Sequence, residues 1–389
     1  MLSAIHRARK SLAGFALVLI AMMLSACVPS RGPVSEPGSG GSVQVALLIP
    51  SGSGSATDEV FGQNLENAAR LAMADLSGVT IDLRVYKTGG SPAAARAMAI
   101  QAVDEGAKII LGPFYSEEAN AAGAAVAPRG VNVLAFSNNA AIAGGNVFVL
   151  GQTFENTARR LATYAVRNGK NKVLIVHDQN LAGNVGRTAI EGGIAAAGGS
   201  VVGVTSYEFS QNGIAQTAAG IVQKAQSSGA NAVFLTADTV GALPLVTQLL
   251  AENGLSRTSA QLIGLTRWDV PAATLSLPGV QGGWFAMPDP GLSSQFQARY
   301  QAAYGSPPVQ VAGLAYDGIA AIGALVRQGK ADALTQAELT QGAGFVGVSG
   351  IFRFLPNGTN ERGLAVAQIS NNQVVVIDPS PRSFSGAGF

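Results

Sequence analysis

Polar and aromatic side chains gather directly after several short apolar runs that read as β-strands. These groups are Ser51 with Ser53, Tyr115 with Ser116, and Ser137 with Asn138. In open parallel sheets, ligands bind in the crevice beyond the carboxyl ends of the strands. Hydroxyl groups can donate to an anion there, and so can the free N–H groups of a following helix. The pattern favours a site for a small polar ligand, although an ordinary surface turn stays open for Ser51 and Ser53.

Ser116 has two interpretations. We expect it to be the N-cap of a helix, because Glu117 and Glu118 would then lie in the first turn, where acidic residues are favourable. A capping serine can still donate to a ligand, whereas the two glutamates would oppose an anion if they faced it. Capping and ligand binding therefore both stay open for this residue.

The residues that most enzyme mechanisms need are missing. The sequence has no G-x-S-x-G nucleophile elbow and no G-x-x-x-x-G-K-[ST] phosphate loop. A G-x-G-x-x-G run at Gly342, Gly344 and Gly347 precedes a strand instead of opening a helix, which indicates a flexible connection. One cysteine and two histidines leave no basis for a metal cage. We expect no catalytic residue, no metal and no cofactor, and hence no enzyme.

The composition excludes further classes of protein. The chain has 389 residues, of which 48% are hydrophobic and 12% charged, so it is not disordered and is long enough for two domains. The net charge is +2 and no basic run occurs, which argues against nucleic acid as a partner.

The first 26 residues resemble a sorting signal. Arg7, Arg9 and Lys10 precede a short apolar run, and the only cysteine, Cys27, follows Ser25 and Ala26. This arrangement resembles the bacterial lipobox, in which the cysteine is lipidated and anchors the protein; the alternative is a plain secretory signal with a chance cysteine. Val28 after the cysteine favours the outer membrane over the inner one. Residues 27–42 are rich in Pro, Gly and Ser and predict a flexible tether.

Strand-like runs alternate with helix-like stretches over most of the remaining chain. A first series of strands is expected at Val43–Ile49, Ile81–Tyr86, Lys108–Leu111 and Val131–Phe136, and a second at Lys172–His177, Ser200–Tyr207, Ala232–Leu235 and Gln261–Leu265. Strands that alternate with helices of 10–15 residues indicate parallel sheets covered on both faces. The fold class is therefore α/β with parallel sheets.

The order of these segments resembles the type I periplasmic binding proteins, especially those that bind leucine, isoleucine and valine. The segments that carry the resemblance are VALLIPSGSGSATDEVFGQNLENAARLA, IILGPFYSEEA, VNVLAFSNNA and FQARYQAAYGSPPVQVAGLAYDGI. The resemblance implies two Rossmann-like lobes that are joined by three hinge crossovers and close on a ligand. It implies a first lobe of residues 43–150 plus 286–329, a second of 151–285 plus 330–378, and a tail of 379–389.

The same resemblance assigns ligand-binding positions. It implies that Ser116 binds a ligand carboxylate with help from Ser137, and that Phe61 lines the side-chain end of the site. Thr266 stands where amino-acid binders carry the acid that pairs with the ammonium group, which is a departure from the family pattern.

Three further positions could complete such a site. Asp238 falls near a tyrosine position of the family pocket and could supply the missing charge, and Trp268 could offer a cation–π face. Tyr316 starts a Tyr-Asp helix segment. Packing is the alternative for Trp268, and packing or capping is the alternative for Tyr316.

Two functions follow from the resemblance. The first is a periplasmic receptor that binds an amino acid or similar small molecule for the permease of an ABC-type importer. The second is an outer-membrane lipoprotein that activates a penicillin-binding protein, because that group shares the fold, the lipobox and segments such as GGWFAMPDP. Both imply a periplasmic location and membrane attachment through a lipid on Cys27.

Overall fold

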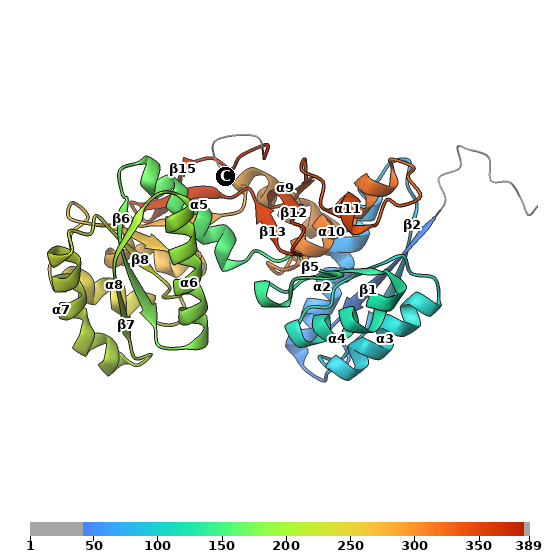
Figure 1. Ribbon diagram of the computed structural model, residues 1–389, viewed down its shortest axis with the longest axis horizontal. Helices are drawn as coiled ribbons and strands as arrows, with labels where there is room; N and C mark the ends of the chain where they lie inside the picture. Colours follow the sequence, from blue (N-terminus) through green and yellow to red (C-terminus); the bar gives the residue numbers. More distant parts are fainter. Residues whose placement is uncertain (1–41, 385–389) are drawn as a thin grey trace, which may run out of the picture. The chain divides into compact units, whose positions relative to one another are not determined.

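The computed structural model describes residues 42–384. The expected signal segment, Cys27 and nearly all of the expected tether lie outside these residues. The described part contains a five-stranded sheet, a seven-stranded sheet and a small three-stranded sheet (Figure 1).

The five-stranded sheet is entirely parallel and forms the centre of the first lobe. In spatial order its strands are β2 (Ile81–Lys87), β1 (Val43–Ile49), β3 (Ile109–Leu111), β4 (Asn132–Ala135) and β5 (Val147–Val149). The helices that follow these strands are α2 (Ala56–Asp75), α3 (Pro92–Asp104) and α4 (Ser116–Val126), with the 3-10 turns η1 (Ala127–Arg129) and η2 (Ala140–Ile142). Ser55 and Ser91 cap α2 and α3 through their side chains.

Alternating residues of β1 enter two different cores. Val45 and Leu47 belong to the core that also holds Leu65 of α2, whereas Ala46 and Leu48 pack with residues of α3 and α4. The first core also receives α9 (Pro290–Tyr304) and α10 (Ala312–Val326) from late in the sequence. In Figure 1 these orange helices lie beside the blue amino-terminal elements.

The seven-stranded sheet forms the second lobe. In spatial order its strands are β15 (Gln373–Asp378), β14 (Ala365–Ser370), β10 (Trp284–Met287), β9 (Gln261–Gly264), β8 (Ala232–Leu235), β6 (Lys172–Asp178) and β7 (Ser200–Tyr207). Its helices are α5 (Phe154–Arg167), α6 (Leu181–Ala196), α7 (Gln211–Ser227) and α8 (Leu243–Glu252), with η3 (Ala272–Ser276) and η4 (Pro278–Val280). Strands β14 and β15 come late in the sequence and are antiparallel additions to an otherwise parallel sheet.

The segment 330–362 differs from the expected lobe boundaries. We expected it in the second lobe, but its helix α11 (Gln336–Leu339) and its strands pack on the first core through Leu339, Phe345, Phe352 and Phe354. The strands are β11 (Phe345–Gly347), β12 (Gly350–Phe354) and β13 (Asn360–Arg362). Of the strands after residue 330, only β14 and β15 join the second sheet, so the third crossover lies after β13 and not at the expected boundary between residues 329 and 330.

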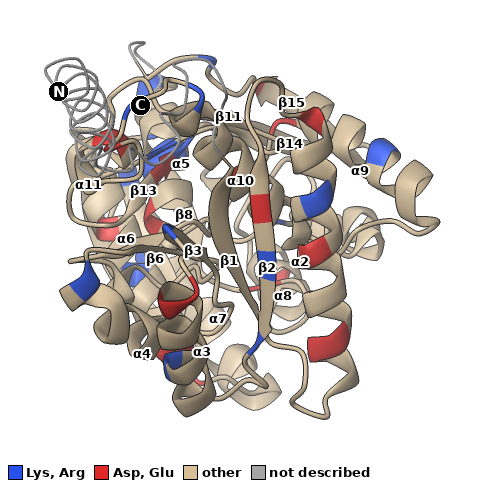
Figure 2. Cartoon of the chain, turned by 90° about the vertical axis from the view of Figure 1, so that its right-hand side faces the viewer, with Lys and Arg blue, Asp and Glu red and all other residues tan. Residues whose placement is uncertain are grey.

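The surface carries charges of both signs. Figure 2 shows acidic and basic residues interspersed along α2 and β2, with no extended region of one sign on them. Within residues 42–384, no helix is both long enough and apolar enough to cross a membrane.

Candidate functional site

A cavity of about 600 Å³ lies at the carboxyl ends of β3 and β4. The turn after β3 contributes Phe114, Tyr115 and Ser116, and the turn after β4 contributes Phe136, Ser137 and Asn138. The opposite walls come from the first crossover, at Gly151 and Gln152, and from the turn after β9, α9, the start of α10 and the small sheet. Four of the positions expected to bind a ligand, Tyr115, Ser116, Ser137 and Asn138, therefore line one space.

Ser116 and Ser137 form the polar centre of this cavity. Their hydroxyl oxygens are 2.9 Å apart, and Ser137 Oγ also accepts a hydrogen bond from the backbone N–H of Asn139 at 3.1 Å. Ser116 is the first residue of α4, and Tyr115 occupies the N-cap position, so the expectation that Ser116 caps the helix is wrong. Its hydroxyl instead binds Ser137, which leaves the first-turn N–H groups of α4 near the cavity.

Glu118 does not face the cavity. Its side chain is fully buried beneath α4, and one of its oxygens, Oε1, has no hydrogen-bond partner among the described residues. Burial raises the pKa of this carboxyl above its ordinary value. Because neither Glu118 nor the exposed Glu117 lines the cavity, the concern that they would repel an anion there is weakened.

Aromatic residues form one wall of the cavity. The rings of Phe114 and Tyr115 meet edge to face, with centroids 5.0 Å apart. Phe61 contacts Phe114 with the rings tilted by 40° and their centroids 5.0 Å apart, but Phe61 does not line the cavity itself. Tyr115 donates to Asp58 Oδ1 at 2.5 Å, and this hydrogen bond raises the pKa of the tyrosine to about 12. The phenol therefore stays neutral and holds the wall in place.

The loop after β1, which carries Ser51 and Ser53, mainly supports the aromatic wall of the cavity. Ser53 donates to Asp58 Oδ2 at 2.6 Å, which together with Tyr115 occupies both oxygens of that carboxylate. Ser51 is 3% exposed and lies against Gly62, where any side chain would clash with its hydroxyl. Neither serine lines the cavity.

The candidates of the second lobe lie outside the cavity. Asp238 is exposed and accepts a hydrogen bond from the backbone N–H of Gly241 at 2.5 Å. Thr266 donates to the carbonyl of Ala237 at 3.2 Å. Trp268 has no exposed surface and packs in the second core against Gly264, so its expected role as a cation–π face is wrong.

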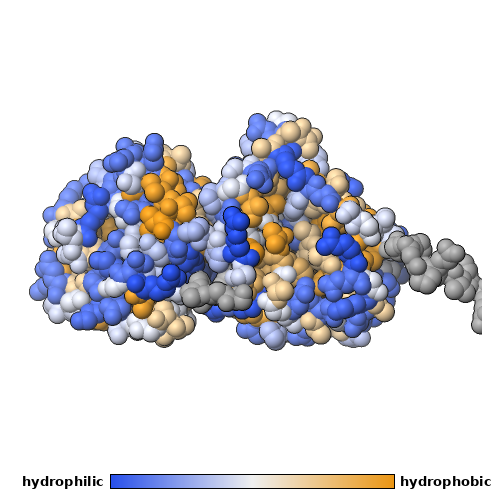
Figure 3. Space-filling view, turned by 90° about the horizontal axis from the view of Figure 1, so that it is seen from above, coloured by the Kyte–Doolittle hydropathy of each residue, from blue (hydrophilic) through white to orange (hydrophobic). Residues whose placement is uncertain are grey.

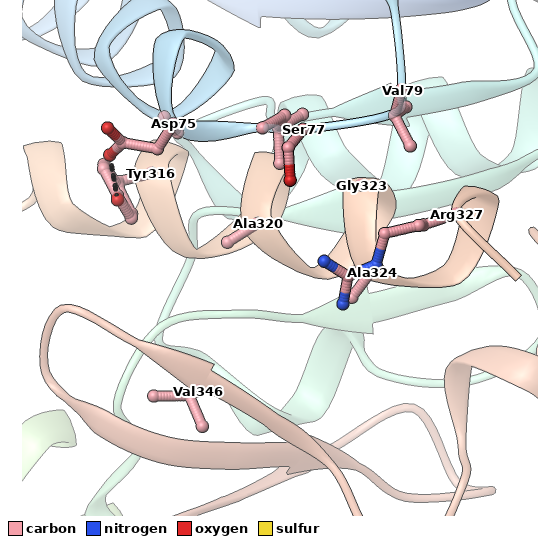
Figure 4. A pocket seen from close by; sticks show the side chains of 11 residues that line it. Asp75, Ser77, Val79, Tyr316, Ala320, Gly323, Ala324, Arg327 and Val346 are labelled. Carbon is pink, nitrogen blue, oxygen red and sulfur yellow. Dashed lines mark hydrogen bonds between the residues drawn. The ribbon is translucent and has the colours of Figure 1, made fainter. Parts of the chain in front are cut away.

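Tyr316 lines a different, smaller cavity of about 220 Å³ between the end of α2 and α10. Figure 4 shows its hydroxyl pointing at Asp75, to which it donates at 2.5 Å. Arg299 also binds Asp75, so the tyrosine belongs to a contact that joins three helices. The expected ligand-binding role of Tyr316 in the main cavity is therefore not supported, and the packing alternative describes its position.

Two arginines in the wall were not expected from the sequence. Arg267, in the turn after β9, donates from Nε and Nη2 to both oxygens of Asp269, at 2.9 and 2.5 Å. Arg362, at the end of β13, pairs with the fully buried Asp317 and donates to the carbonyl of Leu150. The position of Arg267 next to Thr266 was a usable signal, whereas nothing local in the sequence marks Arg362.

Among the described residues, no group of three or more His, Cys, Asp or Glu side chains is arranged to hold a metal ion. The cavity thus combines a hydroxyl pair, a helix N-terminus, an aromatic wall and two oriented guanidinium groups. These elements can bind a small solute that has an acidic group and an apolar body.

Comparison with known proteins agrees with the fold described above. A family model described as periplasmic binding protein matches residues 42–373. No curated protein matches the chain.

Several solved structures share the fold at low identity. One, described as a branched-chain amino acid ABC transporter from Rhodospirillum rubrum, is 18% identical with a TM-score of 0.72 and coverage of 87% of this chain and 100% of the other. A branched chain amino acid ABC transporter periplasmic ligand-binding protein from Burkholderia xenovorans is 18% identical, with a TM-score of 0.67 and coverage of 88% and 97%. A solute binding protein of an ABC transporter from Rhodopseudomonas palustris, in complex with 3,4-dihydroxy benzoic acid, is 19% identical, with a TM-score of 0.57 and coverage of 88% and 98%.

Proposed function

Because the chain belongs to the periplasmic binding protein family, we propose that it is the solute receptor of an ABC-type importer. Its solute is an amino acid or a related small carboxylic acid. It binds in the cavity of about 600 Å³ beside Ser116 and Ser137. The receptor performs no chemistry; it holds the solute for a permease.

The observation that carries this proposal is the convergence of independent chain segments on one cavity. Turns after β3, β4 and β9 and the first crossover all contribute to its wall. A volume of about 600 Å³ lies within the range of roughly 300–1,000 Å³ that is usual for small-molecule sites. The hydroxyl pair Ser116–Ser137 and the N-terminus of α4 supply donors for a carboxylate.

The proposal includes a periplasmic location with a lipid anchor at Cys27, in the outer membrane. Its basis is the lipobox-like sequence before that residue together with the family of the chain. Two or more acyl chains would hold the protein stably at a membrane surface.

A second candidate function is the activation of a penicillin-binding protein. Leu181, Phe209 and Val240 follow the ends of β6, β7 and β8, and they are 81, 53 and 90% exposed. Hydrophobic residues also gather in patches on the face shown in Figure 3. Exposed apolar residues of this kind are available to a protein partner, and docking on a peptidoglycan synthase would use them.

The test is a thermal-unfolding scan of the purified protein against amino acids and small carboxylic acids. A ligand at 100 times its Kd adds about 2.7 kcal/mol, which raises Tm by several degrees at about 2–4 °C per kcal/mol. Ser116→Ala should remove the shift, while Ser227→Ala, at the exposed end of α7, should keep it. If no solute shifts Tm, the importer proposal fails, and pull-down of penicillin-binding proteins tests the second function.

A further inference from the structure

The charges that line the cavity all have one sign. Among the described residues in its wall, the charged ones are Arg267 and Arg362; no aspartate, glutamate or lysine lines it. A buried ammonium group is costly unless a carboxylate or several oxygen acceptors bind it. The wall therefore suits an acid better than a molecule that also carries an ammonium group.

Arg267 is held in a fixed orientation. Its bidentate bond to Asp269 uses Nε and Nη2 and leaves Nη1 outside that pair. Asp269 does not line the cavity, so the carboxylate lies behind the guanidinium group. A paired arginine has little net charge to offer, but its remaining N–H groups are directed donors, which bind carboxylates through geometry.

Arg362 has an unsatisfied donor. Its side chain is only 4% exposed, and it uses Nη1 for Asp317 and Nη2 for the carbonyl of Leu150. Its Nε is buried without a hydrogen-bond partner among the described residues. Because this atom has almost no accessible surface, a solute in the cavity cannot reach it, and Arg362 supports the wall through Asp317 and Leu150.

Two aspartates that the sequence or the site brings near are used elsewhere. Both oxygens of Asp58 accept hydrogen bonds from Ser53 and Tyr115. Asp238 binds the backbone of Gly241, and neither aspartate lines the cavity. The threonine at 266 supplies no charge.

We infer that the solute is an organic acid without an ammonium group. Its carboxylate accepts hydrogen bonds from Arg267, and its apolar body packs on Phe114, Phe136 and Phe296. The Ser116–Ser137 pair provides a further donor to the acid or to hydroxyl groups of the solute. This inference rests on the proposed function and names the solute class of the same cavity.

Calorimetric titration of the purified protein with two matched series tests the inference. One series is 3-phenylpropionate, phenylalanine and 2-phenylethylamine, which share a skeleton and carry the acid, both groups, or the amine. The other is 4-methylpentanoate, leucine and 3-methylbutylamine. In at least one series the acid should bind about tenfold or more tightly than the amino acid, and the amine should not bind.

Variants of the Arg267–Asp269 pair separate binding from structure. Arg267→Gln should weaken binding of the acid about tenfold, because it removes the directed N–H donors of the guanidinium group. Asp269→Asn should keep or tighten binding, since it frees Arg267. The control is Arg187→Gln, which breaks a similar pair with Glu191 on α6 and should leave binding unchanged.

Two results would overturn the inference and leave the receptor function intact. These are tighter binding of the amino acid than of its acid, and equal weakening by Arg267→Gln and Asp269→Asn. Failure of every compound in both series, and of the wider solute panel, would contradict the receptor function itself.

Discussion

Arg362 and Asp317 form an ion pair with an Nη1–Oδ2 distance of 3.1 Å, and their side chains are 4 and 0% exposed. The pair joins β13 to α10, and the same arginine donates to the carbonyl of Leu150 just before the first crossover. Asn360, two residues earlier in β13, donates to the carbonyls of Val149 and Gly151 at 2.7 and 2.8 Å. The short strand β13 thus binds residues 149–151, where the chain leaves the first lobe.

Loss of the buried ion pair should destabilise the protein strongly. Asp317→Asn leaves the Arg362 charge buried without its partner, and removing one member of such a pair costs about 3–5 kcal/mol. Urea unfolding measures this loss. Breaking the partly exposed Arg187–Glu191 pair of α6 with Arg187→Gln should change the free energy of unfolding by about 0.5 kcal/mol or less. Equal effects of the two variants would show that the buried pair contributes no more to the free energy of unfolding than the pair on α6.

A methyl group at Gly347 should also disturb the buried ion pair, through Asp317. A Cβ there would clash with the carboxylate of Asp317, so Gly347→Ala should lower the free energy of unfolding by about 1–3 kcal/mol. Gly342 lies in the same glycine-rich run but has no neighbour within 4 Å of a Cβ. Gly342→Ala should therefore be neutral or stabilise slightly. Equal destabilisation by both variants would contradict the packing described for Gly347.

Trp268 should matter for stability and not for binding. Its ring is fully buried in the second core, so Trp268→Phe leaves a cavity and lowers the free energy of unfolding by about 1–3 kcal/mol. Solute affinity, measured by calorimetry at a temperature where the variant is folded, should stay within about twofold, which is under 0.5 kcal/mol. A tenfold loss of affinity would restore the role in ligand binding that the sequence suggested.

Glu118 should make stability depend on pH. Burial raises its pKa in the folded protein above the ordinary value of 4.5, so the folded state holds this proton more tightly than the unfolded state. The stabilising contribution of the protonated Glu118 is present below pH 4.5 and is lost as pH rises through the folded pKa. In Glu118→Gln the side chain does not titrate, so this loss does not occur. The difference between the Tm of the variant and that of the wild type should therefore increase from pH 4.5 to pH 8.

The control for this pH effect is Glu117→Gln, since Glu117 is the exposed neighbour. Its Tm difference from the wild type should stay nearly constant over the same pH range. A constant difference for Glu118→Gln as well would contradict the assigned pKa direction.

The sequence predicted most of the fold because its local signals agree. Apolar runs marked the parallel strands, and Gly169, Gly198 and Gly254 follow helices with the left-handed backbone angles that suit glycine at such ends. The small sheet was misplaced, because nothing local to its short strands shows which of two cores receives Phe345, Phe352 and Phe354. That choice depends on contacts with α10 and β5, which are distant in the sequence.

The site was predictable where it follows strand ends. Ser116 and Ser137 were expected from the rule for parallel sheets, and their hydroxyl groups meet at 2.9 Å. Trp268 and Tyr316 were taken from family resemblance, which fixes a position along the chain but not the direction of a side chain. Arg362 reaches the cavity from β13 through long-range packing, so its part in the wall became visible only in three dimensions.

The most direct test of the central claim is calorimetric titration of the purified protein and of Asn138→Trp with the solute that raises Tm most. Asn138 is exposed and lines the cavity, so a tryptophan there should fill the space without disturbing a core. We predict saturable binding of one solute per chain, lost in Asn138→Trp while its Tm without solute stays unchanged. Binding that survives this substitution, or no binding by the unaltered protein, would contradict the assignment of the cavity as a solute site.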